Sequence, residues 1–253
     1  MLEQVKALGI NFKEEEAAEV QLHHYPFKII VKNEQENFFF SKTIILATGT
    51  RERKLFVPGE KKYFNRGVST CAICDGAFYS GTNLPIIVVG GGYTAFETTL
   101  FVERYTSNNI FLIHRRSEFR AGKSLVEKVK ADKKVKILTN TVVLEIKGDG
   151  EKATAVEVQN LLTNKKKTIP LAVLFLNIGA DPETCLVKNQ EIETNQEHYF
   201  VAKQEQKTSV KGVFVAGDAV KKKLRQIVTA VSDGAVAAQE AINFLNEQNK
   251  KEE

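Results

Sequence analysis

The sequence predicts an α/β protein built from buried strands that run into glycine turns. One apolar strand, residues 84–89, passes directly into the glycine-rich turn 90–95 and then into a helical run that reaches about Tyr105. Two more buried strands, residues 43–49 and 171–179, each end in glycine, so the chain carries a similar closing element twice. Strands that alternate with helices in this way are typical of parallel sheets covered by helices.

The composition is that of an ordinary globular chain. At 253 residues, with 43% apolar and 26% charged residues, it can form one large or two ordinary domains. The net charge of +5 is mild, and the lysine clusters at 165–167, 221–223 and 250–251 are predicted to be solvated. We therefore expect no nucleic-acid partner, although an acidic protein partner would suit this charge.

No stretch of the sequence has the character of a membrane span or a targeting signal. Crossing a bilayer takes roughly 20 consecutive apolar residues, and the N-terminal residues 1–9 contain no apolar run. Three cysteines in this length are too few for a disulfide scaffold. We expect a cytoplasmic protein with no membrane contact.

The first segment reads as the end of a helix followed by short antiparallel strands. Residues 1–10 have helical spacing, whereas 18–22, 27–31 and 37–41 alternate or run apolar. The buried strand 43–49 comes next and ends in Thr48 and Gly49, where glycine lets a ligand or a crossing chain approach. An opening βαβ unit of about 30 residues does not fit before this point, so we expect the first domain to be incomplete.

A polar stretch, 51–58, is predicted to be a hinge or crossover, and a cysteine pair follows it. Cys71 and Cys74 are spaced to close a small disulfide in the first turn of a helix, whose N-terminus stabilises a thiolate. Asp75 gives the leaving thiolate a proton source. Two other interpretations remain: half of a zinc site, for which the only other cysteine is the distant Cys185, or an inert pair in the core.

The turn after the strand 84–89 has the pattern Gly-x-Gly-x-x-Ala of a dinucleotide-binding fingerprint. Gly90 makes the turn, Gly92 lets the backbone approach a pyrophosphate, and Ala95 permits close packing of helix on strand. The pyrophosphate is expected at the helix N-terminus.

The next strand, residues 109–114, ends where a ribose should lie. An NAD site would have an acid there, but this chain has His114, Arg115 and Arg116, followed by Arg120. Arginine grips a phosphate bidentately, so we predict a 2′-phosphate and hence NADPH rather than NADH. The alternative is a solvated basic start of a helix.

Four further strands, 135–138, 142–146, 153–158 and 167–169, are interpreted as one β-meander that crosses over. The strand 171–179 follows them.

The last segment places an acid at the end of a strand. Residues 212–219 form the strand, which ends in Gly217 and Asp218, and a helix is expected from about Arg225 to about Leu245. An acid beside a helix N-terminus can hold a polyol hydroxyl. Alternatively, Asp218 is satisfied locally beside a capped helix.

Together these motifs resemble the low-molecular-weight thioredoxin reductases, which are flavoproteins with two dinucleotide-binding domains. The resemblance covers essentially the whole chain. It rests on Ala47-Thr-Gly49, Cys71-Ala-Ile-Cys-Asp-Gly76, Gly90–Ala95 followed by Glu97, His114-Arg-Arg-Ser-Glu-Phe-Arg-Ala121, Gly217-Asp218 and Arg225-Gln-Ile-Val-Thr-Ala230.

The resemblance implies two Rossmann-like domains, each with a β-meander, and an NADPH domain inserted into an FAD domain. Residues 1–52 and 182–253 would form the FAD-binding domain, and 53–181 the NADPH-binding domain with the redox motif. The inter-domain crossings would fall near 51–54 and 180–184, about which the family alternates two domain orientations.

The resemblance also implies a reaction path in which NADPH reduces FAD, FAD reduces the Cys71–Cys74 disulfide, and the dithiol reduces thioredoxin. Cys74 would face the flavin, Cys71 would attack thioredoxin, and Asp75 would donate and accept the proton. The residues implied in cofactor binding are Gly90, Gly92, Tyr93, Thr94, Ala95, Glu97, His114, Arg115, Arg116 and Arg120 for NADPH, and Thr48, Gly49, Gly217, Asp218, Ala219, Arg225 and Gln226 for FAD. We also expect a homodimer and no metal.

The sequence departs from the family pattern in two places. The first glycine-rich fingerprint, which holds the FAD pyrophosphate, has no counterpart, so we expect the FAD domain to be incomplete at its N-terminus and FAD to bind weakly or not at all. Tyr93 stands where the family usually has a small acid or amide, so we expect its ring to alter NADPH binding or to shield the flavin. Two other functions remain open: an NADPH-binding remnant without reductase activity, and a reductase of a peroxiredoxin-type partner.

Overall fold

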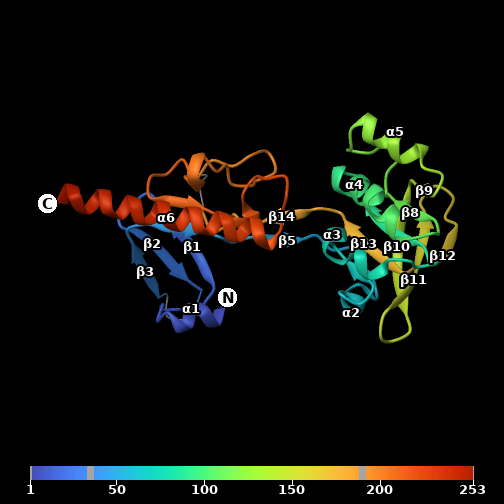
Figure 1. Ribbon diagram of the computed structural model, residues 1–253, viewed down its shortest axis with the longest axis horizontal. Coiled ribbons are helices and arrows are strands. Elements are labelled where there is room, and N and C mark those ends of the chain that lie inside the picture. The colour runs from blue at the N-terminus through green and yellow to red at the C-terminus, as the bar shows by residue number, and fades with distance from the viewer. Residues whose placement is uncertain (1, 33–36, 188–191, 253) are drawn as a thin grey trace. The chain divides into compact units, whose positions relative to one another are not determined.

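The computed structural model describes residues 2–32, 37–187 and 192–252, and it divides into two compact units. The first unit combines residues 1–51 with 181–253, and the second comprises residues 52–180 (Figure 1). The first unit is therefore discontinuous in sequence, and the second is inserted into it.

The first unit begins with a short helix and an antiparallel meander. Helix α1 (Leu2–Ala7) precedes the strands β1 (Ala17–Gln21), β2 (Phe27–Val31) and β3 (Phe38–Ser41), which pair in the order β1-β2-β3. Val20 pairs with Ile29, and Lys28 with Phe40. The predicted helix end and three short antiparallel strands are confirmed.

The rest of the first unit joins two distant segments in a parallel pair. Strands β4 (Ile44–Leu46) and β15 (Val213–Val215) pair in parallel, with Leu46 opposite Val215. The helix α6 (Ile227–Glu252) packs on this pair through Ala237 and Ala241, which contact Phe214 and Ala216. Two short 3₁₀ turns, η4 (Gln204–Gln206) and η5 (Gly217–Ala219), flank β15.

Helix α6 is longer than the sequence reading expected. It continues past Leu245 to Glu252. The extension is rich in glutamate, glutamine and lysine, which have high helix propensity and need no apolar partner. The apolar pattern alone therefore predicted a helix that ends about two turns before the observed end at Glu252.

The second unit is organised around a five-stranded parallel sheet in the order β6-β13-β7-β8-β9. These strands are β6 (Val68–Ser69), β7 (Ile86–Gly90), β8 (Ile110–Ile113), β9 (Val135–Leu138) and β13 (Val173–Asn177). All of β7 is buried, as expected for a central strand covered on both faces. The strand order reverses between β7 and β13, and such a switch point is where open α/β sheets bind ligands.

The assignment of residues 135–138 to the meander was wrong. β9 is the edge strand of the parallel sheet, where Ile110 pairs with Val135 and Leu112 with Ile137. A short apolar strand has the same sequence pattern in a parallel sheet and in an antiparallel meander. The helix α5 (Lys123–Ala131) connects β8 to β9 and returns the chain to the same edge of the sheet, so that β9 runs parallel to β8.

The second meander has three long strands and covers one face of the parallel sheet. Strands β10 (Thr141–Gly148), β11 (Ala153–Asn160) and β12 (Lys166–Pro170) pair antiparallel in that order. Their buried Ile146, Val156 and Ile169 form one core with Ile87 and Leu174. The helices pack against the other face of the sheet and form a separate core there. The strand residues of this core, which alternate with those of the first, include Ile86, Val88 and Phe175.

The helical elements of the second unit follow its strands. They are α2 (Glu60–Tyr63), α3 (Ala72–Asp75), η1 (Gly76–Tyr79), α4 (Tyr93–Val102), η2 (Glu103–Tyr105) and α5. Within the described ranges, no helix has the length and apolar character to span a bilayer.

The predicted crossover contains a strand. β5 (Thr50–Glu52) pairs with β14 (Ala180–Pro182), the two segments in which the chain passes between the units. Beyond β5 the loop is fixed by Glu60, whose buried carboxylate accepts hydrogen bonds from the N–H groups of Leu55 (3.0 Å) and Phe56 (2.8 Å).

Candidate functional site

Cys71 and Cys74 form a disulfide at the start of α3, which confirms the predicted pairing. Cys71 is the N-cap residue, and its Sγ accepts a hydrogen bond from the N–H of Cys74 at 3.1 Å. The N–H of Cys71 itself donates to Ser69 Oγ at 3.0 Å. Cys74 is exposed and Cys71 half-buried, and Asp75 ends the same helical turn.

The helix behind the disulfide is short. α3 has four residues and continues as η1, so its macrodipole is weaker than that of a long helix. The hydrogen bond from the N–H of Cys74 is a contact that can favour a thiolate at Cys71 once the disulfide is reduced.

The glycine-rich turn follows β7 at the switch point of the sheet. Gly90 has φ +157°, and a Cβ there would lie 2.3 Å from the carbonyl oxygen of Asn177 and 2.7 Å from Ala95 Cβ. Gly92 is the N-cap of α4 and has no side-chain cap. The nearest atom to a Cβ on Gly92 would be Arg120 Nη2, at 4.0 Å. The turn is thus closed on its protein side and open above Gly92.

A loop of basic residues closes over this turn. The N–H of Arg120 donates to the carbonyl oxygen of Gly91 at 2.8 Å, and Phe119 packs edge-on against Phe96 of α4 with ring centroids 4.9 Å apart. Arg115, Arg116 and Arg120 are exposed. The loop therefore places the guanidinium group of Arg120 near Gly92, and the exposed Arg115 and Arg116 take no part in the core.

His114 lies under this loop. Its Nε2 is 3.0 Å from the carbonyl oxygen of Glu118, and its ring occupies the space where a Cβ on Gly91 would stand. Burial lowers the pKa of His114 below its ordinary value of 6.5, and the positive charges of Arg116, Arg115 and Arg120 lower it further. The carbonyl of Glu118 acts in the opposite direction. His114 is therefore neutral at neutral pH.

The remaining residues of the predicted dinucleotide motif lie on α4. Ala95 is fully buried, whereas Tyr93, Thr94 and Glu97 are exposed. A Cβ added to Gly122, the N-cap of α5, would lie 2.8 Å from the hydroxyl oxygen of Tyr93. Gly122 has an unstrained backbone, with φ −65°, so its missing side chain makes room for Tyr93.

In the first unit, the ends of β4 and β15 carry two polar atoms without partners. Thr48 Oγ1 and Asp218 Oδ1 are buried, and neither has a hydrogen-bond partner. Because Leu46 pairs with Val215, Thr48 and Asp218 follow neighbouring strands at the same edge. A buried polar atom left unpaired costs about 1–3 kcal/mol, so such atoms are expected where a ligand supplies the partner. At least one carboxylate oxygen of Asp218 is therefore not satisfied by the chain itself.

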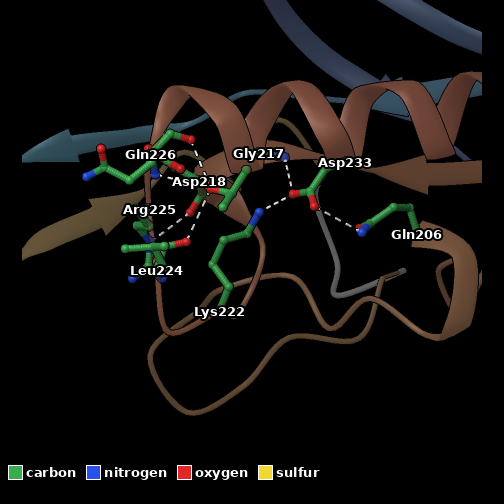
Figure 2. A network of polar contacts seen from close by, with 9 residues as sticks. Gln206, Gly217, Asp218, Lys222, Leu224, Arg225, Gln226 and Asp233 are labelled. Carbon is green, nitrogen blue, oxygen red and sulfur yellow. Dashed lines mark hydrogen bonds and ion pairs between the residues drawn. The ribbon is translucent and has the colours of Figure 1, made fainter.

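Arg225 and Gln226 lie beside Asp218 in the loop before α6 (Figure 2). Arg225 Nε donates to the carbonyl oxygen of Asp218 at 3.3 Å, and the guanidinium lies over the Tyr199 ring at 4.2 Å. The N–H of Gln226 donates to Thr229 Oγ1 at 3.1 Å. The structure thus brings Gly217, Asp218, Ala219, Arg225 and Gln226 to one place.

Asp233 is a residue of this region that sequence reasoning missed. It lies on α6, where its Oδ2 accepts from the N–H of Gly217 at 2.9 Å and pairs with Lys222, and its Oδ1 accepts from Gln206 Nε2 at 3.2 Å (Figure 2). The side chains of Asp233 and Lys222 are each only 15% exposed. Nothing in the local sequence distinguishes Asp233 from a surface acid of a helix.

Sequence reasoning also missed Ser69, Tyr79, Gly122 and Asn177. Asn177 ends β13, next to Gly90, and its Nδ2 donates to the carbonyl oxygen of Thr70 at 3.3 Å. Across the described parts of the chain, no group of three or more His, Cys, Asp or Glu side chains is arranged to hold a metal ion.

The chain is similar to known disulfide oxidoreductases over most of its length. Residues 3–234 match the family model described as pyridine nucleotide-disulphide oxidoreductase. A thioredoxin reductase of Yarrowia lipolytica is 39% identical over 250 residues, which are 98% of this chain and 78% of that protein. Thioredoxin reductase 1 of Saccharomyces cerevisiae is 36% identical over 247 residues, 97% of this chain and 77% of the relative.

The fold is similar to that of a solved relative. The thioredoxin reductase from Giardia duodenalis superposes with a TM-score of 0.90 at 33% identity, covering 97% of this chain and 79% of that one. The parallel sheets and antiparallel meanders are therefore those of a known α/β fold, as the motifs predicted.

Proposed function

The chain belongs to the low-molecular-weight thioredoxin reductase family of pyridine nucleotide-disulphide oxidoreductases, and on this basis we propose that it is an NADPH-dependent thioredoxin-disulfide reductase. The observation that carries the proposal is the Cys71–Cys74 disulfide, which lies in the same compact unit as the turn Gly90–Gly92 and the loop of arginines. An electron acceptor and the features of an electron-donor site thus share residues 52–180.

NADPH fits the second unit through its two charged parts. The pyrophosphate would lie on the open backbone at Gly92 and the N-terminus of α4, where N–H groups point outward. The 2′-phosphate would be held by Arg115, Arg116 and Arg120, which are exposed and free of the core. His114, whose pKa is lowered, would add no positive charge there, and its Nε2 is directed at the carbonyl oxygen of Glu118.

FAD fits the first unit, which we assign as the FAD-binding domain (1–52 and 182–253), with the NADPH-binding domain (53–181) inserted into it. The unpartnered Asp218 Oδ1 would accept a hydrogen bond from a hydroxyl group of the ribityl chain, and Thr48 Oγ1 would accept or donate one. Arg225 and Gln226 lie beside Asp218. When bound, FAD would carry electrons between NADPH and the disulfide. The match covers 78% and 77% of the lengths of the two relatives named above, so just over a fifth of each has no counterpart in this chain.

Cys71, Cys74 and Asp75 supply the dithiol chemistry. Cys71 is assigned as the nucleophile toward thioredoxin, which is supported by the N–H of Cys74 that stabilises negative charge on its sulfur. Cys74 is the sulfur assigned to face the flavin. Asp75 protonates the leaving thiolate as the disulfide opens and recovers the proton when it closes.

The protein partner is assigned as thioredoxin, and the surface around the disulfide supports a protein contact. Ile73, between the two cysteines in sequence, and Phe78, four residues after Cys74, are 60% and 84% exposed. Exposed apolar side chains of this kind are typical of interaction sites. A homodimer and a cytoplasmic location complete the proposal.

The decisive experiment is a spectrum of the purified chain with and without added FAD, followed by NADPH and thioredoxin. A yellow protein that NADPH bleaches and that reduces thioredoxin supports the reductase. Cys74→Ser should abolish thioredoxin reduction yet leave NADPH-to-flavin transfer. A colourless protein that ignores added FAD would contradict the assignment and leave an NADPH-binding remnant.

A further inference from the structure

A pocket of about 150 Å³ lies directly beside the redox disulfide. Its lining residues come from the segment before the cysteines and from the two helical turns after them, and they are Asn65, Val68, Ser69, Asp75, Phe78 and Tyr79. Four of these six side chains are polar. A polar space of this size has room for several water molecules.

The pocket is connected to the disulfide on two sides. Ser69 Oγ accepts the hydrogen bond from the N–H of Cys71, and Asp75 follows Cys74 directly. A polar pocket between these groups gives Asp75 access to exchangeable protons from a side other than the disulfide itself.

Tyr79 is placed to donate into this pocket. Its ring packs in the apolar core on the helical side of the sheet, and its hydroxyl oxygen accepts a hydrogen bond from the N–H of Gly67. That bond uses an acceptor site of the hydroxyl and leaves its proton free to point elsewhere.

Tyr79 stays protonated under working conditions. Burial raises its pKa above the ordinary value of 10.0, and the negative charge of Asp75 raises it further, against the smaller effect of the Gly67 N–H. The other elements packed here present Phe101 from α4 and Tyr105 from η2, both lying against Gly76. Of the charged residues in the described parts of this segment, Asp75 is thus the one that faces Tyr79.

We propose that Tyr79 is a positioning residue for proton transfer at the redox disulfide: its hydroxyl donates, through water in this pocket, toward the carboxyl group of Asp75. The inference rests on the proposed function, in which Asp75 protonates the leaving sulfur. With a small dithiol as reductant, a thiolate of the dithiol attacks one cysteine sulfur, the Cys71–Cys74 bond breaks, and a mixed disulfide forms. The carboxylate of Asp75 takes a proton from the pocket water held by Tyr79 and passes it to the released thiolate. The second dithiol sulfur then displaces the remaining cysteine, so the protein is reduced and the dithiol oxidised.

The test is the rate at which dithiothreitol reduces the disulfide in the full chain, with no NADPH, FAD or thioredoxin present. Reduction is followed by alkylation of the cysteine thiols, which rise from one (Cys185) to three. Rates are compared across pH 5.5–8 at a fixed concentration of dithiothreitol thiolate. Tyr79→Phe, which keeps the ring, should lower the rate about threefold to tenfold and change the shape of the pH profile, because it removes only the donor.

Two further variants separate positioning from a structural effect. Tyr105→Phe removes a hydroxyl close to the same turn but outside the pocket, and should leave the rate unchanged. Asp75→Asn should slow the reduction, and adding Tyr79→Phe to it should slow it no further, because the tyrosine acts through the carboxyl group.

The inference is overturned if Tyr79→Phe leaves the rate unchanged, or if it slows the Asp75→Asn variant as much as the natural chain. It is equally overturned if Asp75→Asn has no effect. Because this assay needs no cofactor, its outcome is independent of whether the chain binds FAD or reduces thioredoxin.

Discussion

At the scale of single residues, Gly90 and Gly92 stand two positions apart in one turn under different constraints. A Cβ on Gly90 would lie only 2.3 Å from the carbonyl oxygen of Asn177, which is a clash. A Cβ on Gly92 would have no neighbouring atom closer than 4.0 Å. Gly92 also has φ −97°, which any residue adopts. The first glycine serves the fold, and the second keeps a space open.

We expect Gly90→Ala to lower the midpoint of thermal unfolding, because a backbone atom must move to relieve the clash. Gly92→Ala should leave that midpoint within about 2 °C but weaken NADPH binding tenfold or more, because the added methyl group fills the open cradle. Calorimetry and a fluorescence titration with NADPH measure the two effects. Equal losses of stability in both variants would contradict this division.

Under the proposed function, we expect the three exposed arginines, Arg115, Arg116 and Arg120, to select NADPH over NADH. Replacing Arg115 and Arg116 together by alanine should raise the dissociation constant for NADPH about 100-fold or more, since charge-assisted hydrogen bonds contribute about 1.5–3 kcal/mol each. The constant for NADH should change little, because NADH has no 2′-phosphate. Arg104→Ala, an exposed arginine on η2, is the matched control. A similar weakening of both nucleotides would exclude a 2′-phosphate site here.

His114 should make stability depend on pH in a defined window. Its pKa is lowered in the folded chain, so between that value and 6.5 the unfolded chain binds more protons, and stability falls as pH decreases below 6.5. In His114→Gln this contribution disappears. Urea unfolding at pH 7.5 and 5.5 should therefore show a smaller loss of unfolding free energy for the variant, and an equal loss would be evidence against a neutral, half-buried imidazole.

At the scale of elements, α6 is attached to the end of β15 by a polar contact as well as by its apolar face. Asp233 on the helix accepts a hydrogen bond from the N–H of Gly217 and forms an ion pair with Lys222 (Figure 2). These contacts hold the turn that carries Asp218 against the helix. The helix thereby determines where the unpartnered Asp218 Oδ1 points.

Asp233→Ala should lower the free energy of unfolding by about 2–4 kcal/mol, because it leaves a largely buried ammonium group and a backbone N–H without partners. The control is Glu16→Ala, which breaks the Lys32 pair whose side chains are 68% and 72% exposed, and which should cost less than about 1 kcal/mol. Urea unfolding followed by circular dichroism measures both. A cost for Asp233→Ala no larger than that of the control would mean that the contact does not fix the turn.

At the scale of the whole molecule, the inserted unit contains everything needed for its own core. Both of its apolar clusters draw only on residues between 52 and 180, and so do its parallel sheet and meander. The first unit, in contrast, joins β4 to β15 across more than 160 residues of intervening chain, Ile44 pairing with Val213.

We therefore expect a fragment of residues 52–180 to fold alone, with one cooperative thermal transition, a closed Cys71–Cys74 disulfide and an unchanged affinity for NADPH. The reason is that a domain with its own core needs no contact with its host. The fragment 181–253 alone should not fold, because its strand lacks β4. Lack of a cooperative transition in the 52–180 fragment would show that the units depend on each other.

The sequence by itself determined the features that are local along the chain. These features are the continuous apolar run of β7, the two glycines after it, the spacing of Cys71 and Cys74, and the cluster His114–Arg116. Each can be recognised within a few residues, because it depends on the side-chain period, the backbone freedom or the spacing of neighbouring residues. Those signals were sufficient to predict the α/β class, the disulfide and the family.

Only the tertiary structure decided which distant groups meet. β9 belongs to the parallel sheet because α5 returns the chain beside β8, and the missing side chain of Gly122 makes room for Tyr93. Asp233 accepts a hydrogen bond from the N–H of Gly217, and Tyr79 lines the same pocket as Asp75. Each of these contacts depends on the register and packing of elements, and that geometry is set by the energy of the whole core rather than by any local pattern of residues.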